Sequence, residues 1–86
     1  MRQPIFVMEF NVADVELLAR AGVSRELMSD ASGRDGAPHS VLMTSDFAEL
    51  NRWRLFLNRE ARPYRYCQHD TNGGREMGRS RSPDWL

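Results

Sequence analysis

Apolar residues recur at helical spacing over residues 45–61, which predicts one long helix around which the chain is organised. Ser45 and Asp46 are both good N-cap residues, and Glu49 follows Asp46 at the spacing of a capping box. The residue before Pro63 is biased away from helical geometry, so we expect the helix to end near residue 61. The expected core stripe is Phe47, Leu50, Trp53, Leu57 and Ala61.

The opposite face of this predicted helix carries apolar side chains among arginines. Arginine and aromatic residues are enriched where proteins bind partners. We therefore take this set as the candidate partner-binding residues: Arg52, Leu55, Phe56, Arg59 and Arg62. The alternative is that a second layer of the same small protein covers Phe56, since single apolar residues are common on surfaces.

The rest of the chain alternates strand-like and helix-like segments. The predicted strands are residues 4–11, 39–44, 63–69 and, after a hairpin signal at Asn72 and Gly73, residues 75–79. The first is apolar on both faces over its first half, which favours a central position. A helix is expected over residues 12–21, ended by Gly22, and a second short helix over residues 25–31, capped by Ser24. Turn-forming residues at 30–38 predict an exposed loop.

This order of elements predicts an α+β fold. A small sheet of three to four antiparallel or mixed strands is expected, with the long helix and a short helical pair packed on it. We assign residues 1–70 to a single domain with a small core, because 86 residues bury little apolar surface. Residues 71–86 are rich in Gly, Arg and Ser, and are expected to form a hairpin or a flexible C-terminal tail.

The composition limits the partners and the cellular location that we expect for this chain. Twelve acidic and twelve basic residues balance, so no global charge steers the chain to nucleic acid or a membrane. All basic residues are arginine, which is typical of GC-rich bacteria and their phages. The single Cys67 excludes an internal disulfide and fits a reducing cytoplasm. No apolar run approaches the length of a membrane span. We expect a cytoplasmic protein of a bacterial host cell.

Few residues suggest metal or catalytic chemistry. His39, Cys67, His69 and Asp70 are the only candidate metal ligands, and they lack the paired spacing of a zinc site. Cys67 with His39 is the only candidate nucleophile and base, and the sequence does not bring the two together. No Gly-rich phosphate loop is present. We therefore expect no enzymatic activity, no metal and no cofactor.

Residues 15–29, VELLARAGVSRELMS, resemble the helix-turn-helix of DNA-binding regulators. The resemblance implies a turn at Gly22 and a recognition helix opened by Ser24 and Arg25, whose side chains would reach base edges. Leu18 stands where that family usually has a small alanine. A helical hairpin packed on a sheet explains the same pattern. A DNA-binding transcriptional regulator using residues 15–31 is the alternative function.

A protein-binding module is the function that the sequence favours, acting as an inhibitor by steric occlusion of a partner complex. The chain is similar in size and character to anti-CRISPR proteins, which share no common motif. That similarity implies a protein partner in a nucleic-acid-processing host defence complex. Nucleic acid itself is less favoured as a partner because acidic residues share the long helix. Homodimerisation through the outer helix face is a further expectation.

Overall fold

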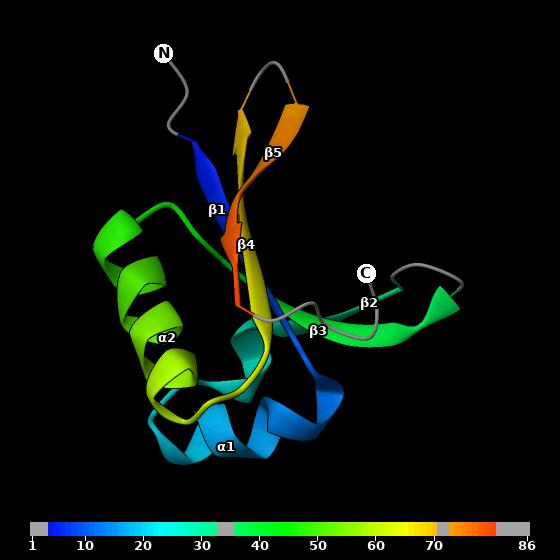
Figure 1. Ribbon diagram of the computed structural model, residues 1–86, viewed down its shortest axis with the longest axis vertical. Helices are drawn as coiled ribbons and strands as arrows, with labels where there is room; N and C mark the ends of the chain where they lie inside the picture. The colour runs from blue at the N-terminus through cyan, green and yellow to red at the C-terminus, as the bar shows by residue number, and fades with distance from the viewer. Residues whose placement is uncertain (1–3, 33–35, 71–72, 81–86) are drawn as a thin grey trace.

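The apolar segment near the N-terminus forms the central strand of one antiparallel sheet, as predicted. The computed structural model describes residues 4–32, 36–70 and 73–80. Within them the strand order is β2-β3-β1-β4-β5 (Figure 1). The strands are β1 Ile5–Phe10, β2 Met28–Ser32, β3 Pro38–Thr44, β4 Tyr64–Asp70 and β5 Gly73–Arg79. The α+β class is confirmed, but the predicted three to four strands are too few, because five form.

The helical segments pack on one face of this sheet (Figure 1). They are the 3₁₀ turn η1 Val12–Asp14, α1 Val15–Arg20, the 3₁₀ turn η2 Arg25–Leu27, and α2 Phe47–Arg59. Alternate β1 side chains face the helices and are buried, which closes the core between the two layers. The core cluster is Phe6, Met8, Phe10, Leu18, Leu42, Leu50, Trp53, Leu57 and Tyr64.

The long helix begins where the sequence predicts. The Asp46 carboxylate accepts a 2.9 Å hydrogen bond from the Ala48 N–H, so Asp46 is the N-cap of α2. The reciprocal half of the predicted capping box is not seen, because the Glu49 side chain pairs with Arg52 instead. The cap starts α2 shortly after β3 ends at Thr44.

Gly22 ends the first helix, as predicted. The Val23 N–H donates to the Leu18 carbonyl and the Gly22 N–H to the Ala19 carbonyl, both at 3.1 Å. This is the Schellman pattern, which needs a left-handed residue at the position after the cap. Gly22 supplies it with φ of 101°. The turn sends the chain from α1 back across the side of α2.

The end of α2 uses the same pattern without a glycine. The Arg62 N–H donates to the Leu57 carbonyl at 2.8 Å, and the Ala61 N–H to the Asn58 carbonyl at 3.1 Å. Ala61 takes the left-handed position with φ of 55°, which is unfavourable for a residue with a Cβ. The helix therefore ends at Arg59, and the prediction that Ala61 belongs to the core stripe is wrong, because Ala61 is exposed.

The prediction of a second short helix over residues 25–31 is also wrong. Only the single turn η2 is helical, and the chain then enters β2, which pairs with β3 from Met28 opposite Leu42 to Ser32 opposite Pro38. The loop expected over residues 30–38 is accordingly shorter, and residues 33–35 lie outside the described residues. Strand pairing with β3 has overridden the helical propensity of this segment.

The start of the C-terminal segment forms the strand β5, which pairs antiparallel with β4, so the hairpin alternative describes it better than a flexible tail. It pairs with β4 from Asp70 opposite Gly73 to Arg65 opposite Arg79, with an irregularity after Tyr66. The turn signal at Asn72, like residues 81–86, lies outside the described residues. No helix in the described part of the chain has the length and apolarity needed to cross a membrane.

Candidate functional site

The inner stripe of α2 anchors this helix and determines which residues remain outside. Leu50, Trp53 and Leu57 are buried as predicted. Phe47, also assigned to this stripe, remains 48% exposed, although its ring meets that of Phe6 at a centroid distance of 5.3 Å. The three-residue anchor leaves the opposite side of the helix facing solvent.

Four of the five predicted partner-binding residues come together on that outer side. Arg52, Leu55, Phe56 and Arg59 line a shallow pocket of about 300 Å³. Leu55 is 51% exposed, whereas Phe56 is half-buried and packs against the core. Phe56 is therefore neither fully exposed to a partner nor fully covered by a second layer of the same chain. Its inner edge is covered by the same chain and its outer edge remains accessible.

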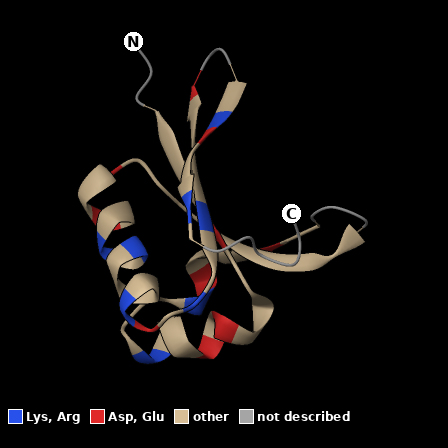
Figure 2. Cartoon of the chain, viewed as in Figure 1, with Lys and Arg blue, Asp and Glu red and all other residues tan. Residues whose placement is uncertain are grey.

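The two arginines of this outer surface are weakly held. The Arg52 guanidinium lies 3.7 Å from the Glu49 carboxylate, and Arg59 lies 3.9 Å from Glu60, with 73% of each arginine side chain exposed. Arg59 also lies over the Phe56 ring at 5.4 Å. Basic and acidic positions are intermixed along α2 (Figure 2). Exposed pairs at these distances contribute little to stability, so both guanidinium groups remain available to a partner.

Arg62 does not belong to this surface. It follows the helix, and its Nε donates a 2.7 Å hydrogen bond to the Asp14 carboxylate, whose side chain is only 6% exposed. This contact joins two parts of the fold and occupies Nε, while 38% of the Arg62 side chain remains exposed. Its assignment to the outer face fails because that face ends with the helix, at Arg59.

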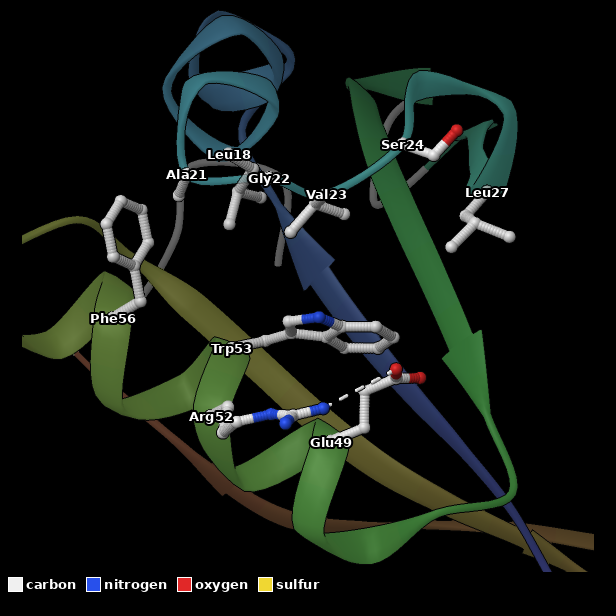
Figure 3. A pocket seen from close by; sticks show the side chains of 10 residues that line it. All are labelled: Leu18, Ala21, Gly22, Val23, Ser24, Leu27, Glu49, Arg52, Trp53 and Phe56. Carbon is white, nitrogen blue, oxygen red and sulfur yellow. Dashed lines mark ion pairs between the residues drawn. The ribbon is translucent and has the colours of Figure 1, made fainter.

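A larger groove lies beside the outer surface, with a volume of about 460 Å³. Side chains from α2 project toward the segment that connects α1 to η2 (Figure 3). The lining residues are Leu18, Ala21, Gly22, Val23, Ser24, Leu27, Glu49, Arg52, Trp53 and Phe56. We call this the α2 groove. It shares Arg52 and Phe56 with the shallow pocket, so the two form one continuous surface.

The α2 groove combines an apolar floor with a polar rim. Trp53, 7% exposed, lines it together with the half-buried Val23, and Leu27 at its edge is 53% exposed. Glu49 and Arg52 supply the charges. An apolar recess with a few polar groups is the usual form of a binding site. Sequence reasoning missed this groove because its second wall is formed by residues 21–27, which were assigned to a helical pair.

The two residues predicted to read DNA are engaged within the chain. Ser24 caps η2, accepting a 3.3 Å hydrogen bond from the Glu26 N–H. The Arg25 guanidinium is paired with the Glu16 carboxylate of α1. Neither residue opens a recognition helix, because residues 25–31 form a turn and a strand. The structural basis of the helix-turn-helix resemblance is therefore absent.

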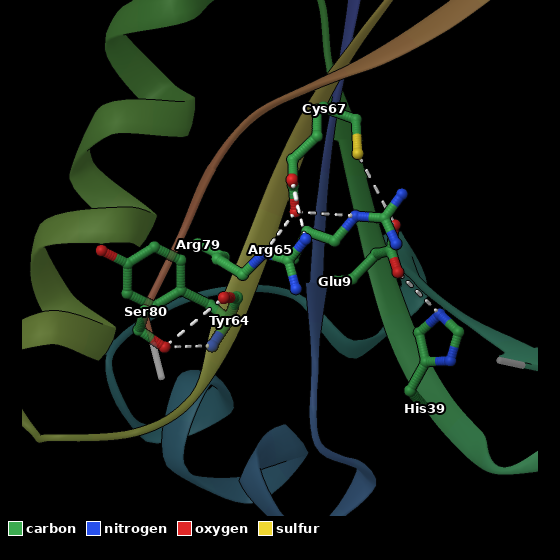
Figure 4. Close-up of polar contacts among 8 residues, drawn as sticks. Glu9, His39, Tyr64, Arg65, Cys67, Arg79 and Ser80 are labelled. Carbon is green, nitrogen blue, oxygen red and sulfur yellow. Dashed lines mark hydrogen bonds and ion pairs between the residues drawn. The ribbon is translucent and has the colours of Figure 1, made fainter. Parts of the chain in front are cut away.

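A second polar group of residues lies on the sheet face away from the helices, centred on Glu9 of β1 (Figure 4). The Glu9 carboxylate is 3.2 Å from His39 Nε2 and 3.7 Å from Arg65 Nε. Glu76 of β5 lies 3.4 Å from Arg65 and 2.8 Å from Arg79. These contacts between polar and charged side chains link four strands, which we interpret as structural cross-strand pairing.

Cys67 is part of the same group, and its thiol donates a 3.7 Å hydrogen bond to Glu9. Burial is the main reason that its pKa is raised above the ordinary thiol value, with Arg65 opposing the shift. The thiol is therefore protonated at neutral pH and is a poor nucleophile. His39 contacts Glu9 and not Cys67 among the contacts described, and no three candidate metal ligands meet within residues 4–32, 36–70 and 73–80.

Comparison with known proteins gives no relative from which to transfer a function. No protein-family model, no curated protein and no solved structure matches this chain.

Proposed function

We propose that this chain is a small non-enzymatic protein-binding module that inhibits a partner complex by covering one of its surfaces. One observation carries the proposal: Leu55 is half exposed between Arg52 and Arg59, beside an apolar groove. Arginine next to exposed apolar side chains is the composition found at the centre of protein interfaces. A rim of exposed charge then restricts which partners can approach.

The stability of the fold does not account for this surface. Leu55 and Leu27 each leave about half of their area in water, and neither belongs to the core cluster. Exposing two large aliphatic side chains beside a groove costs hydrophobic free energy that a partner would recover on binding. The raised pKa of the Cys67 thiol supports the non-enzymatic part of the proposal.

The composition suggests the setting in which such a module works. An arginine-only basic composition and small size fit a bacterial or phage protein acting in the host cytoplasm. We propose a subunit of a host defence complex that processes nucleic acid as the target, by analogy of size and character with anti-CRISPR proteins. Blocking a protein surface of that complex needs no catalytic residue.

DNA binding through residues 15–31 is not carried into this proposal. A recognition helix must enter the major groove, and the described chain offers only the turn η2 and the edge strand β2 in its place. Asp30 and the acidic pair partner of Arg25 further reduce any attraction to phosphate.

Comparative capture from a bacterial lysate, followed by mass spectrometry, tests the proposal. The test variant carries Arg52→Glu and Arg59→Glu. The matched control carries Arg20→Glu and Arg75→Glu, which change the net charge equally at exposed arginines that line neither pocket. We expect a protein partner that the wild type and the control retain and the test variant loses. Equal retention by all three folded proteins would contradict the proposal.

A further inference from the structure

We propose that the α2 groove receives an apolar side chain from an acidic segment of the partner protein. In this proposal, carboxylates that flank the apolar residue bind Arg52 and Arg59, and an oxygen of the same segment accepts a hydrogen bond from the indole N–H of Trp53. The inference rests on the proposed function and specifies the chemistry of the partner. Three independent features of the groove support it.

The first feature is the size and apolar lining of the recess. At about 460 Å³, it lies within the range of roughly 300–1,000 Å³ that is typical of binding pockets. Its two walls are α2 and the segment from Leu18 to Leu27, and they belong to the same small core. A partner side chain placed between Phe56 and Leu27 would contact apolar atoms on both walls.

The second feature is the indole of Trp53, more than nine-tenths buried at the floor of the groove. Its ring nitrogen lies on the edge that faces the wall carrying Val23 (Figure 3). This N–H has no hydrogen bond to another described residue, and it is not one of the buried polar atoms left without a partner, so it remains in contact with solvent and can donate to a ligand. A donor directed into an apolar recess selects a ligand that presents an oxygen acceptor next to its apolar group.

The third feature is the charge at the groove entrance. Arg52 lines both the groove and the shallow pocket, and Arg59 extends the basic surface about two turns further along α2. The guanidinium group forms bidentate hydrogen bonds with carboxylates, which matches an acidic segment in geometry as well as in charge. The weak contacts of Arg52 with Glu49 and of Arg59 with Glu60 are ones that a better-placed carboxylate can replace.

Single-stranded nucleic acid also binds to arginine and aromatic surfaces, but this site is less suited to it. Trp53 is buried and Phe56 is covered on one side by Arg59, so neither offers an open ring face for a base to stack on. An acidic peptide segment needs only two cationic contacts and one apolar anchor.

The experiment selects binders from a random linear peptide library displayed on phage, with the folded chain as bait. Selected peptides are then synthesised and titrated against the wild type and variants at low and high salt. Leu27→Ser alters the edge of the groove, and Met43→Ser is the matched control, since the two residues are 53% and 55% exposed. Met43 lies on β3 and lines neither pocket.

We expect selected peptides in which an aromatic or aliphatic residue is flanked by Asp or Glu. Leu27→Ser and the Arg52→Glu, Arg59→Glu pair should each weaken their binding by about tenfold or more, and Met43→Ser should leave it unchanged. Trp53→Phe keeps a ring but removes the N–H, so we expect a loss of about threefold to tenfold. Should that variant unfold, a shift of the wild-type indole N–H resonance on peptide addition gives the same information.

Other outcomes separate the two proposals. Apolar peptides that lose affinity on Leu27→Ser, but lack acidic residues and ignore the arginine reversals, would overturn the acidic-segment inference and leave the binding surface intact. Peptides that bind all variants equally would overturn both. A labelled single-stranded oligonucleotide that binds more tightly than the selected peptides, and is displaced by them, would assign the groove to nucleic acid and also overturn the inference.

Discussion

The Arg62 guanidinium binds the Asp14 carboxylate at 2.7 Å across 48 residues of sequence. Asp14 ends η1 and leads into α1, and Arg62 follows the C-terminal turn of α2, so the pair joins the two helical segments. Only one carboxylate oxygen is satisfied within the described residues, because the buried Oδ2 of Asp14 has no partner there. This contact helps to hold the two walls of the α2 groove in position.

Arg62→Ala should therefore destabilise the fold without acting directly on the partner surface. Removing one partner from a buried ion pair leaves an uncompensated charge, but Arg62 is 38% exposed, so we expect a loss of about 2 kcal/mol. Urea denaturation of wild type and variant measures it. A variant as stable as the wild type would show that the Asp14 contact contributes nothing to the fold.

The two helix C-termini predict opposite effects from exchanging alanine and glycine. Gly22→Ala places a Cβ at φ of 101° with no atom within 4 Å of it, so its cost of about 1 kcal/mol is purely conformational. Ala61→Gly should instead stabilise the fold by about 0.5–1 kcal/mol, because glycine tolerates the left-handed conformation. Thermal unfolding of both variants tests the pair. Shifts of Tm in the same direction would contradict the Schellman assignment at one of the two termini.

Cys67 predicts a measurable pH dependence, because burial raises the pKa of its thiol in the folded state. The unfolded chain then loses the thiol proton at lower pH than the folded chain. Stability is therefore unaffected below about pH 8.5 and declines as pH rises through the folded-state pKa. Alkylation at pH 8 should be slow in the native protein and fast in denaturant. Equal rates in both states would show that the thiol is accessible and unperturbed.

Self-association through the outer surface of α2 stays a prediction. An apolar patch of this kind is most simply buried by a two-fold dimer, so the average mass in light scattering should rise with protein concentration. Leu55→Ser should suppress that rise, and Met43→Ser should not. A constant monomer mass for the wild type would rule out the dimer while leaving partner binding open.

The sequence predicted α2 and the central strand because their signals are strong and local. The Asp46 side chain caps α2 by accepting a hydrogen bond from a backbone N–H in the first turn of the same helix. Leu50, Trp53 and Leu57 recur at helical spacing and are buried. In β1, buried and partly buried side chains alternate as the pattern requires. Both elements could be recognised without knowing what they contact.

The strand β2 could not be predicted because its state depends on a partner. Its sequence, MSDAS, contains no β-branched or aromatic residue, and none of its residues is fully buried. Pairing with β3 determines its structure, whereas the second wall of the groove is formed by the segment just before it, from Leu18 to Leu27. Arg62 was misplaced for a similar reason, since its partner Asp14 is distant in sequence. The outer face could be predicted because all of its residues lie on one helix. The groove could not, because it forms only where α2 meets a second segment of the chain.

Site-specific photocrosslinking tests the central claim most directly. Benzoylphenylalanine replaces Leu55 in one protein and Met43 in another, two residues of nearly equal exposure at 51% and 55%. After irradiation in a bacterial lysate, we predict a discrete adduct to a partner protein from position 55 and none from position 43, with excess unlabelled wild type suppressing it. Equal labelling from both positions, or none from position 55 while the partner is still captured, would contradict binding through α2.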